Sequence, residues 1–178
     1  SCQIKFYITV DETTKTILVT GDIGNKIIDN KFVGKYQHVA NCDLLIGEST
    51  YGDRPDLKTG TKERKNDLEK LRSIIDMQVK EMHGRVIIPS FAQSRCQALA
   101  YMIYQLYKES DWKPKVYIDS PLAIKIFEDY LECLDNEEQK ILKEIVDDPM
   151  FTFVKESEDS KTLASSTEPC VIISTAGM

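Results

Sequence analysis

Apolar and polar positions alternate over residues 3–10, and a short β-branched run follows at residues 16–20. Such alternation is typical of strands with one buried face, so the two runs predict a hairpin of two half-buried strands. The polar residues 11–15 between them predict the turn. The second strand runs directly into Gly21 and Asp22. Asp22 fits either a plain turn former or a metal-binding carboxylate at a strand end, and the pattern leaves both open.

From about residue 43 the chain predicts strands that alternate with helices. A short apolar run, Leu44 to Ile46, predicts a buried strand that breaks into Gly47 and Glu48. An acid at the end of a buried strand requires a partner, because burial of an unpaired charge is costly. Further strands are predicted at residues 85–92, 115–119 and 170–174, and helices at about 61–83, 94–109, 121–134 and 136–147. The fold class is therefore α/β: a β-rich start joined to a mostly parallel sheet with helices on both faces.

The ends of the predicted strands share one polar pattern. Each apolar run breaks into small hydroxyl residues, as at Ser90, Ser120 and Ser174, and Arg95 follows the first of them. Because the carboxyl ends of parallel strands meet at one edge of a sheet, these side chains are expected to be neighbours. Hydroxyls, an arginine and the backbone N–H groups of helix starts suit a phosphate-bearing ligand. The sequence therefore predicts an anion-binding edge.

Composition narrows the class of protein. The chain has 178 residues, 42% of them hydrophobic and 29% charged, and a net charge of −6. This acidity argues against nucleic-acid binding by the whole surface but permits a local basic groove. Its apolar runs are too short to span a bilayer and no leader is visible, so no membrane contact is expected. Five scattered cysteines without a CxxC pair indicate reduced thiols in a cytoplasmic protein.

Five segments, in order, resemble the β-CASP branch of the metallo-β-lactamase fold, which contains zinc-dependent RNA nucleases of the RNase J and polyadenylation-cleavage type. The matching segments are Gly21-Asp22, Glu48-Ser49-Thr50-Tyr51-Gly52, Ile88-Pro89-Ser90-Phe91-Ala92 with Arg95 and Gln97, Tyr117 to Ala123, and Ser174 to Met178. The resemblance covers essentially the whole chain. It implies that residues 1–55 are the C-terminal part of a metallo-β-lactamase segment and that residues 56–178 are an incomplete β-CASP domain.

The resemblance also implies roles for individual residues. Asp22 matches the carboxylate that bridges two zinc ions, and Glu48 matches an acid that orients a histidine near the scissile phosphate. These two are the expected catalytic residues, with Asp22 also the metal ligand. The remaining candidates are expected to contact RNA or its phosphates: Ser49, Thr50, Tyr51, Ser90, Arg95, Ser120 and Ser174. For Ser90, Arg95, Ser120 and Ser174, turn capping is at least as good an explanation.

The family's zinc-binding histidines have no counterpart in the chain, which therefore resembles an interior piece of a longer protein. The expected parent is a di-zinc hydrolase that cleaves RNA phosphodiester bonds with metal-activated water, and the piece alone is expected to be inactive. A non-catalytic RNA-binding or scaffold subunit is the alternative. A nucleotide-binding α/β domain is disfavoured because neither GxGxxG nor a Walker loop is present. The open edge of the hairpin leaves a homodimer as a further expectation.

Overall fold

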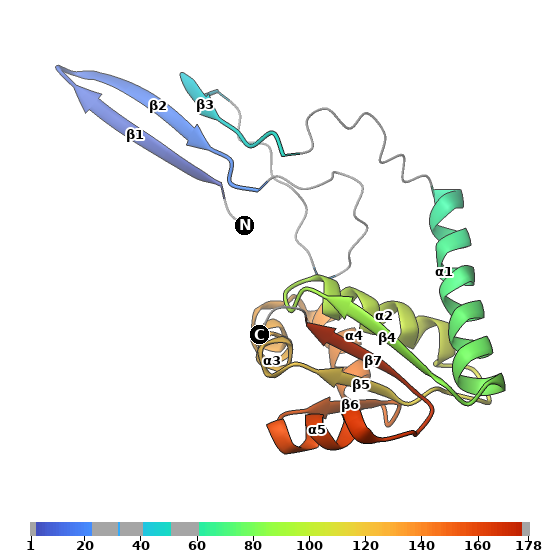
Figure 1. The fold of residues 1–178 in the computed structure, drawn as a ribbon. Coiled ribbons are helices and arrows are strands. Elements are labelled where there is room, and N and C mark those ends of the chain that lie inside the picture. Colours follow the sequence, from blue (N-terminus) through green and yellow to red (C-terminus); the bar gives the residue numbers. More distant parts are fainter. Residues whose placement is uncertain (1–2, 23–31, 33–40, 51–60, 176–178) are drawn as a thin grey trace. The chain divides into compact units, whose positions relative to one another are not determined.

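A computed structural model describes residues 3–22, 32, 41–50 and 61–175, with the side chains of residues 61–65 left out (Figure 1). The chain divides into two compact units, Ser1–Asp29 with Gly34–Gly60, and Asn30–Val33 with Thr61–Met178. The domain boundary predicted after residue 55 falls outside the described residues and stays a prediction. No helix in the described ranges is long and apolar enough to cross a membrane.

The first unit is built on a three-stranded sheet in the order β1-β2-β3. Strands β1 (Ile4–Val10) and β2 (Thr13–Val19) form the predicted antiparallel hairpin, and β3 (Leu44–Ile46) pairs in parallel with β2. The turn consists of Asp11 and Glu12 only. The prediction of a turn over residues 11–15 was therefore wrong, because residues 13–15 pair with β1 despite their polar side chains.

Two predictions for this unit need correction. The strand that leads to Glu48 joins the hairpin rather than the parallel sheet of the second unit. It is also exposed instead of buried, with Leu45 at 58% of its full accessibility. The apolar residues of β1 are exposed as well, whereas Leu18 of β2 is 5% exposed. An alternating sequence pattern identifies the apolar face of a strand, but it does not predict which other element, if any, packs on that face.

The second unit contains a four-stranded parallel sheet in the order β4-β7-β5-β6. Its strands are β4 (Arg85–Ser90), β5 (Val116–Asp119), β6 (Phe151–Val154) and β7 (Cys170–Thr175). Its helices are α1 (Thr61–Ile75), α2 (Arg95–Tyr107), α3 (Pro121–Cys133), α4 (Asn136–Asp147) and α5 (Ser157–Ser165), and the π-helical segment η1 (Asp76–Glu81) continues α1. The predicted α/β class is confirmed, and so are the strands and helices predicted from residue 61 onward. Strand β6 and helix α5 were not predicted, because four residues beside a polar segment give too short a pattern.

One face of the parallel sheet carries the main core. Val171 and Ile173 of β7 point into a cluster with residues of the helices such as Ile103, Phe127 and Leu142, all at most 2% exposed. Helices α2 and α4 lie behind the sheet in Figure 1, on this side. The helical layer fixes the sheet and leaves the loops at the strand ends free to carry the site.

The opposite face carries helix α5, so helices lie on both faces as expected, but the described residues cover this face only in part. Leu163 of α5 packs there with Cys170 and Ile172. Ile87 is the register partner of Ile172 on β4, yet it is 65% exposed against 6% for Ile172. The guanidinium of Arg85 fastens α5 to the sheet, because it donates to the carbonyls of Ser166 at 2.8 Å and Leu163 at 2.6 Å.

The hairpin turn predicts a stabilising substitution. Asp11 and Glu12 have φ of 48° and 63°, the left-handed values of a type I′ turn, in which glycine is favoured at the second position. We expect Glu12→Gly to stabilise the hairpin by about 0.5–1 kcal/mol, after the larger entropy of glycine in the unfolded chain is deducted. Slower amide hydrogen exchange across β1 and β2 is the measurement.

The matched control for this substitution is Thr14→Gly. Thr14 pairs with Thr9 inside the ladder, with 2.8 Å between their hydroxyl oxygens. Glycine there removes the cross-strand contact and adds chain entropy, so exchange is expected to accelerate. Equal acceleration in the Glu12→Gly variant contradicts the assignment of strain to the turn.

Candidate functional site

The carboxyl ends of β4, β7 and β5 lie side by side, as the sequence predicted. Ser174 is the register partner of Pro89 on one side and of Asp119 on the other, and Ser90 pairs with Thr175. The strand ends that carry Ser90, Ser120 and Ser174 are therefore neighbours at one edge of the sheet. This confirms the arrangement, while the roles of these residues stay predictions.

Ser120 has a structural use for its hydroxyl. It is the residue before α3, and its Oγ accepts a hydrogen bond from the backbone N–H of Ala123 at 3.1 Å. The Thr175 hydroxyl is a second partner, 2.7 Å away. Ser120 is 2% exposed. Of the two alternatives that the sequence left open for Ser120, capping and phosphate contact, the geometry favours capping. Pro121 at the first helical position agrees with this.

Two residues at this edge were not singled out from the sequence. Thr175 connects the end of β7 to Ser120, and its only signal was a second hydroxyl beside Ser174. Asp119 is half-buried and its carboxylate accepts a hydrogen bond from the Ser160 hydroxyl at 3.0 Å. Since Ser160 belongs to the unpredicted helix α5, this contact had no signal in the sequence. Asp119 places an acid among hydroxyls at the edge.

The loop from β4 to α2 presents Phe91 and Arg95 to solvent. The backbone N–H of Cys96 donates to the Phe91 carbonyl at 3.2 Å, and the side-chain amide of the buried Gln97 donates to the Ala92 carbonyl at 3.0 Å. The Arg95 guanidinium lies 4.9 Å from the centre of the Phe91 ring. Burial raises the pKa of the Cys96 thiol to about 12, so this cysteine is unsuited to act as a nucleophile.

Asp22 and Glu48 follow the same end of two paired strands. Val19, near the end of β2, is the register partner of Ile46, which ends β3, and the Thr20 N–H donates to the Ile46 carbonyl at 3.0 Å. Because the strands are parallel, the residues that follow them lie at the same end of the pair. Asp22 comes three residues after Val19, and Glu48 comes two residues after Ile46. Both carboxylates are exposed at this end, and so are Ser49 and Thr50. Tyr51 lies outside the described residues.

Asp43 fixes the start of β3 against β2. Its carboxylate accepts hydrogen bonds from the Thr16 N–H at 2.8 Å and the Thr16 hydroxyl at 2.9 Å, and Lys15 lies 3.2 Å away. These contacts, the backbone hydrogen bond first, lower the pKa of Asp43 from 3.8 to about 2. Through Asp43, the strand that leads to Glu48 is held in register.

The described residues do not form a metal site by themselves. Within the described ranges, no group of three or more His, Cys, Asp and Glu side chains is placed to hold an ion. Zinc in proteins takes three or four protein ligands, mostly histidine or cysteine, so Asp22 and Glu48 alone do not fit it. Two zinc ions therefore stay a prediction about the longer protein.

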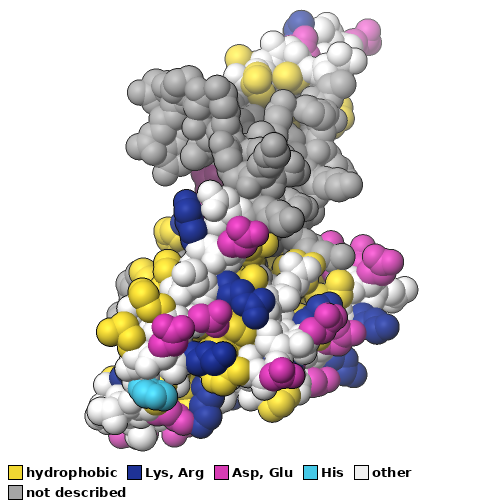
Figure 2. Space-filling view, turned by 90° about the vertical axis from the view of Figure 1, so that its right-hand side faces the viewer, with side chains coloured by type: hydrophobic (Ala, Val, Ile, Leu, Met, Phe, Trp, Pro, Cys, Tyr) yellow, Lys and Arg dark blue, Asp and Glu magenta, His cyan; other side chains and the backbone are white. Residues whose placement is uncertain are grey.

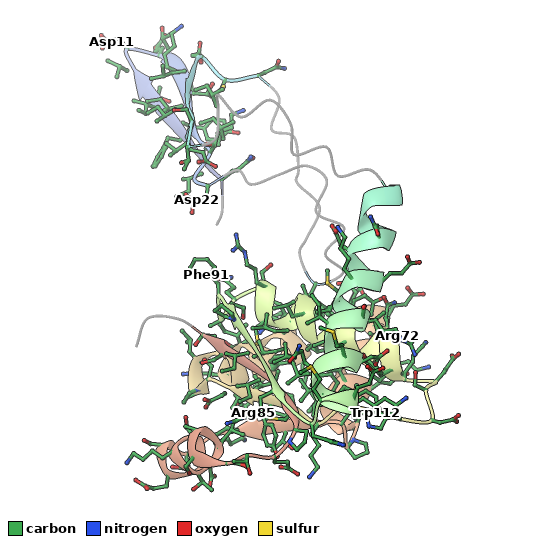
Figure 3. All side chains as sticks on the ribbon, turned by 45° about the vertical axis from the view of Figure 1, so that its right-hand side comes forward. Asp11, Asp22, Arg72, Arg85, Phe91 and Trp112 are labelled. Atoms are coloured by element: carbon green, nitrogen blue, oxygen red, sulfur yellow. The ribbon has the colours of Figure 1, made fainter. Side chains whose placement is uncertain are left out.

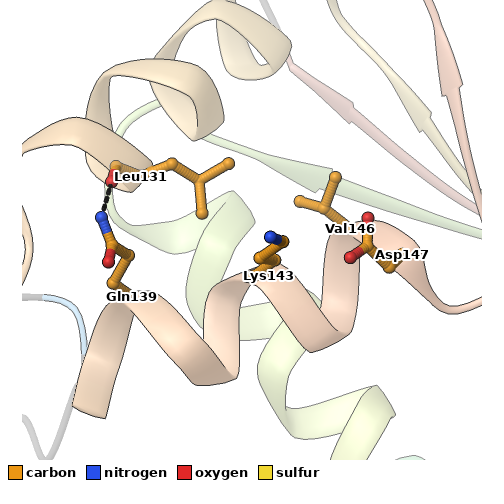
Figure 4. A pocket seen from close by; sticks show the side chains of 5 residues that line it. All are labelled: Leu131, Gln139, Lys143, Val146 and Asp147. Carbon is orange, nitrogen blue, oxygen red and sulfur yellow. Dashed lines mark hydrogen bonds between the residues drawn. The ribbon is translucent and has the colours of Figure 1, made fainter. Parts of the chain in front are cut away.

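The rest of the described surface has no strongly charged field on the side that carries α1. Lys and Arg side chains are interspersed there with Asp and Glu, as Figure 2 shows. A groove of about 360 Å³ opens between α3 and α4 (Figure 4), lined by Leu131, Gln139, Lys143, Val146 and Asp147. The Gln139 amide donates to the Leu131 carbonyl at one end of it. Neither Asp22 nor any of the strand-end hydroxyl residues is among the residues that line this groove.

The geometry defines an α/β protein whose polar residues gather where parallel strands end. Comparison with known families matches residues 96–178 to the Beta-Casp domain. An RNase J-like protein of Methanocaldococcus jannaschii is 31% identical over 176 residues, which are 97% of this chain and 39% of the relative. A ribonuclease of Thermus thermophilus is 27% identical over 92% of this chain and 37% of its own length. Integrator complex subunit 11 of Danio rerio is 27% identical over 93% of this chain and 26% of its own length.

The chain therefore belongs to the β-CASP branch of the metallo-β-lactamase superfamily, and the resemblance of its motifs is confirmed. It spans well under half the length of these relatives.

Titration of Asp43 tests the attachment of β3. Because its pKa is lowered on folding, the carboxylate stabilises the β2–β3 pairing fully above its unfolded pKa of 3.8 and loses this effect as the pH falls through about 2. Carboxyl NMR is expected to give a pKa near 2. Thr16→Val removes the hydroxyl donor and is expected to raise that pKa. A Thr16→Val pKa equal to that of the parent contradicts the contact.

Ser120→Ala tests the capping role. We expect it to lower the free energy of unfolding by about 1 kcal/mol or more, because the helix loses its cap and the Thr175 hydroxyl loses a partner. Urea unfolding of the same chain measures the loss. The control is Ser174→Ala, at a half-buried neighbouring hydroxyl, for which a change within about 0.5 kcal/mol is expected. Equal losses in the two variants contradict a specific cap.

Proposed function

We propose that this chain is part of a metal-dependent nuclease that hydrolyses RNA phosphodiester bonds. The observation that carries the proposal is the placement of Asp22 and Glu48 at the same end of the paired strands β2 and β3, within a β-CASP chain. Relatives named as an RNase J-like protein and a ribonuclease support the choice of RNA as substrate.

In this proposal the two carboxylates have different tasks. Asp22 serves as a metal ligand, and two zinc ions are the expected metals. Glu48 accepts a hydrogen bond from a basic side chain and so holds that side chain at the scissile phosphate. Further metal ligands are needed from beyond the described residues, since two carboxylates do not satisfy zinc. The chain alone is accordingly expected to hold no metal tightly and to cleave nothing.

The strand-end edge of the second unit supplies the candidate contacts to the RNA backbone. Ser90 and Ser174 carry hydroxyls at the ends of β4 and β7, and Arg95 adds a cation. In an acidic chain such contacts have to be local, because the overall charge of −6 repels phosphate. Ser120 is the weakest of the candidates, because its hydroxyl is buried and caps α3.

A second candidate function is that of a non-catalytic RNA-binding subunit in a larger complex. It is favoured by the relative that is named a subunit of the Integrator complex. The two candidates differ in one measurable property, since only the nuclease depends on the carboxylate of Asp22 for turnover.

The test substitutes Asp22→Asn in the full-length protein. Loss of the charge removes a metal ligand while the size of the side chain is kept, so RNA cleavage is expected to fall at least about a hundredfold. Cleavage of a labelled single-stranded RNA and the metal content of the same preparation are measured together. The control is Asp11→Asn, an exposed acid in the turn at the other end of the hairpin.

Three outcomes separate the candidates. Loss of both cleavage and bound zinc in Asp22→Asn alone supports the nuclease. Near-normal cleavage in that variant overturns the role of Asp22. RNA binding by a full-length parent that cleaves nothing in the presence of zinc points to the binding subunit.

A further inference from the structure

Phe91 is an exposed aromatic side chain at the end of β4. It is 66% exposed, and Figure 3 shows it projecting from the tip of the strand. Scattered exposed apolar residues are common in soluble proteins, and this one alone indicates nothing. What sets Phe91 apart is the manner in which its backbone is held and the group that lies against its ring.

The backbone that follows the ring is fixed by the first turn of α2. The Cys96 N–H binds the Phe91 carbonyl, and the next carbonyl, of Ala92, accepts from the fully buried Gln97 side chain. The Arg95 N–H donates to the Gln93 carbonyl at 2.8 Å, which closes the bend. A ring carried on such a loop loses little conformational entropy when a ligand stacks on it.

A cation accompanies the ring. The Arg95 guanidinium lies 4.9 Å from the ring centre, and none of the ion pairs among the described residues includes Arg95. Its N–H donors are therefore available for a phosphate, while its plane and the ring provide surfaces on which a base can stack. An aromatic ring beside an arginine is the combination with which proteins bind unpaired nucleotides.

We propose that Phe91 and Arg95 form a stacking site for one unpaired base of single-stranded RNA, with Arg95 also binding an adjacent phosphate. The inference rests on RNA as the ligand of the proposed function and adds a base contact to it. A phenylalanine ring offers no hydrogen-bond donor or acceptor, so the site accepts any base. A base within a duplex is already stacked on its neighbours, so the site selects unpaired segments.

Binding of short RNAs to the full-length protein tests the site. A fluorescent single-stranded oligoribonucleotide is compared with versions that carry one abasic ribose at each position in turn, in metal-free buffer so that no cleavage occurs. Phe91→Ala is expected to weaken binding of the intact RNA at least about fivefold, the lower end for loss of one stacked base. One abasic position is expected to weaken binding of the parent by a similar factor and to leave Phe91→Ala unaffected.

Two matched variants separate stacking from general apolar contact. Phe91→Tyr keeps an aromatic ring and is expected to bind within about twofold of the parent, whereas Phe91→Leu is expected to bind like Phe91→Ala. Ile87→Ala is the control, because Ile87 lies on β4, which ends just before Phe91, and is 65% exposed, against 66% for Phe91. Thermal melts of all variants are expected to coincide, since neither side chain is part of the core.

Several results overturn the proposal. Parent-like affinity of Phe91→Ala for intact RNA does so, as does full retention of affinity by Phe91→Leu. If Phe91→Ala leaves the RNA affinity unchanged but alters the sedimentation coefficient, the ring takes part in a protein contact instead. The nuclease proposal fails separately. If the unsubstituted protein binds RNA through Phe91 but never cleaves it, only the nuclease proposal is overturned. If it cleaves RNA and substitution of Phe91 has no effect, only the stacking site is overturned.

Discussion

The parallel pairing of β4, β7 and β5 is the constraint on which the second unit depends. Parallel strands all end at the same edge, so every loop that follows them opens on one side of the sheet. Ser174 is in register with both Pro89 and Asp119, and this places the loops that carry Ser90, Arg95 and Ser120 next to one another. A change of one residue in this register turns every side chain of β7 to the other face of the sheet, so that Ser174 and Thr175 exchange faces. The main core prevents that shift, because Val171 and Ile173 of β7 are fully buried in it.

The hydroxyl residues at this edge differ in their use: some hold the structure together, and others are available to a ligand. The Thr175 hydroxyl donates to the Ser120 hydroxyl, and Ser120 also caps the start of α3, so the two residues join the ends of the middle strands β7 and β5. Ser90 and Ser174 are only half-buried, and Phe91 and Arg95 are exposed. Residues that are fully committed to hydrogen bonds within the protein hold the edge together, and the more exposed ones beside them remain able to meet a ligand. Burial therefore separates Ser120, which is 2% exposed, from Ser90 and Ser174, whereas Thr175 is half-buried as they are and differs from them by its hydrogen bond to Ser120.

The sequence predicted most of the second unit because its signals are local. Apolar runs such as Val171 to Ile173 and the Ser120-Pro121 helix start determine their own elements. Strand β6 escaped because four residues carry too little pattern. The strand before Glu48 was assigned to the wrong sheet for a different reason: its partner is β2, more than twenty positions earlier, and no local pattern encodes the choice of partner. Pairing between distant segments is decided by packing and by contacts such as that of Asp43 with Thr16.

The candidate site was predictable in the kind of residue and less so in the use of each one. Resemblance pointed to Asp22 and Glu48, but their position at one end of the β2–β3 pair follows from the register of Val19 with Ile46. That register had no signature in the sequence. The opposite case is Phe91 and Arg95, whose spacing of four residues is unremarkable in a sequence. Only the bend between strand and helix brings the guanidinium onto the ring. In this chain, therefore, sequence motifs indicate where chemistry belongs, and the turns that follow the strands determine which side chains meet there.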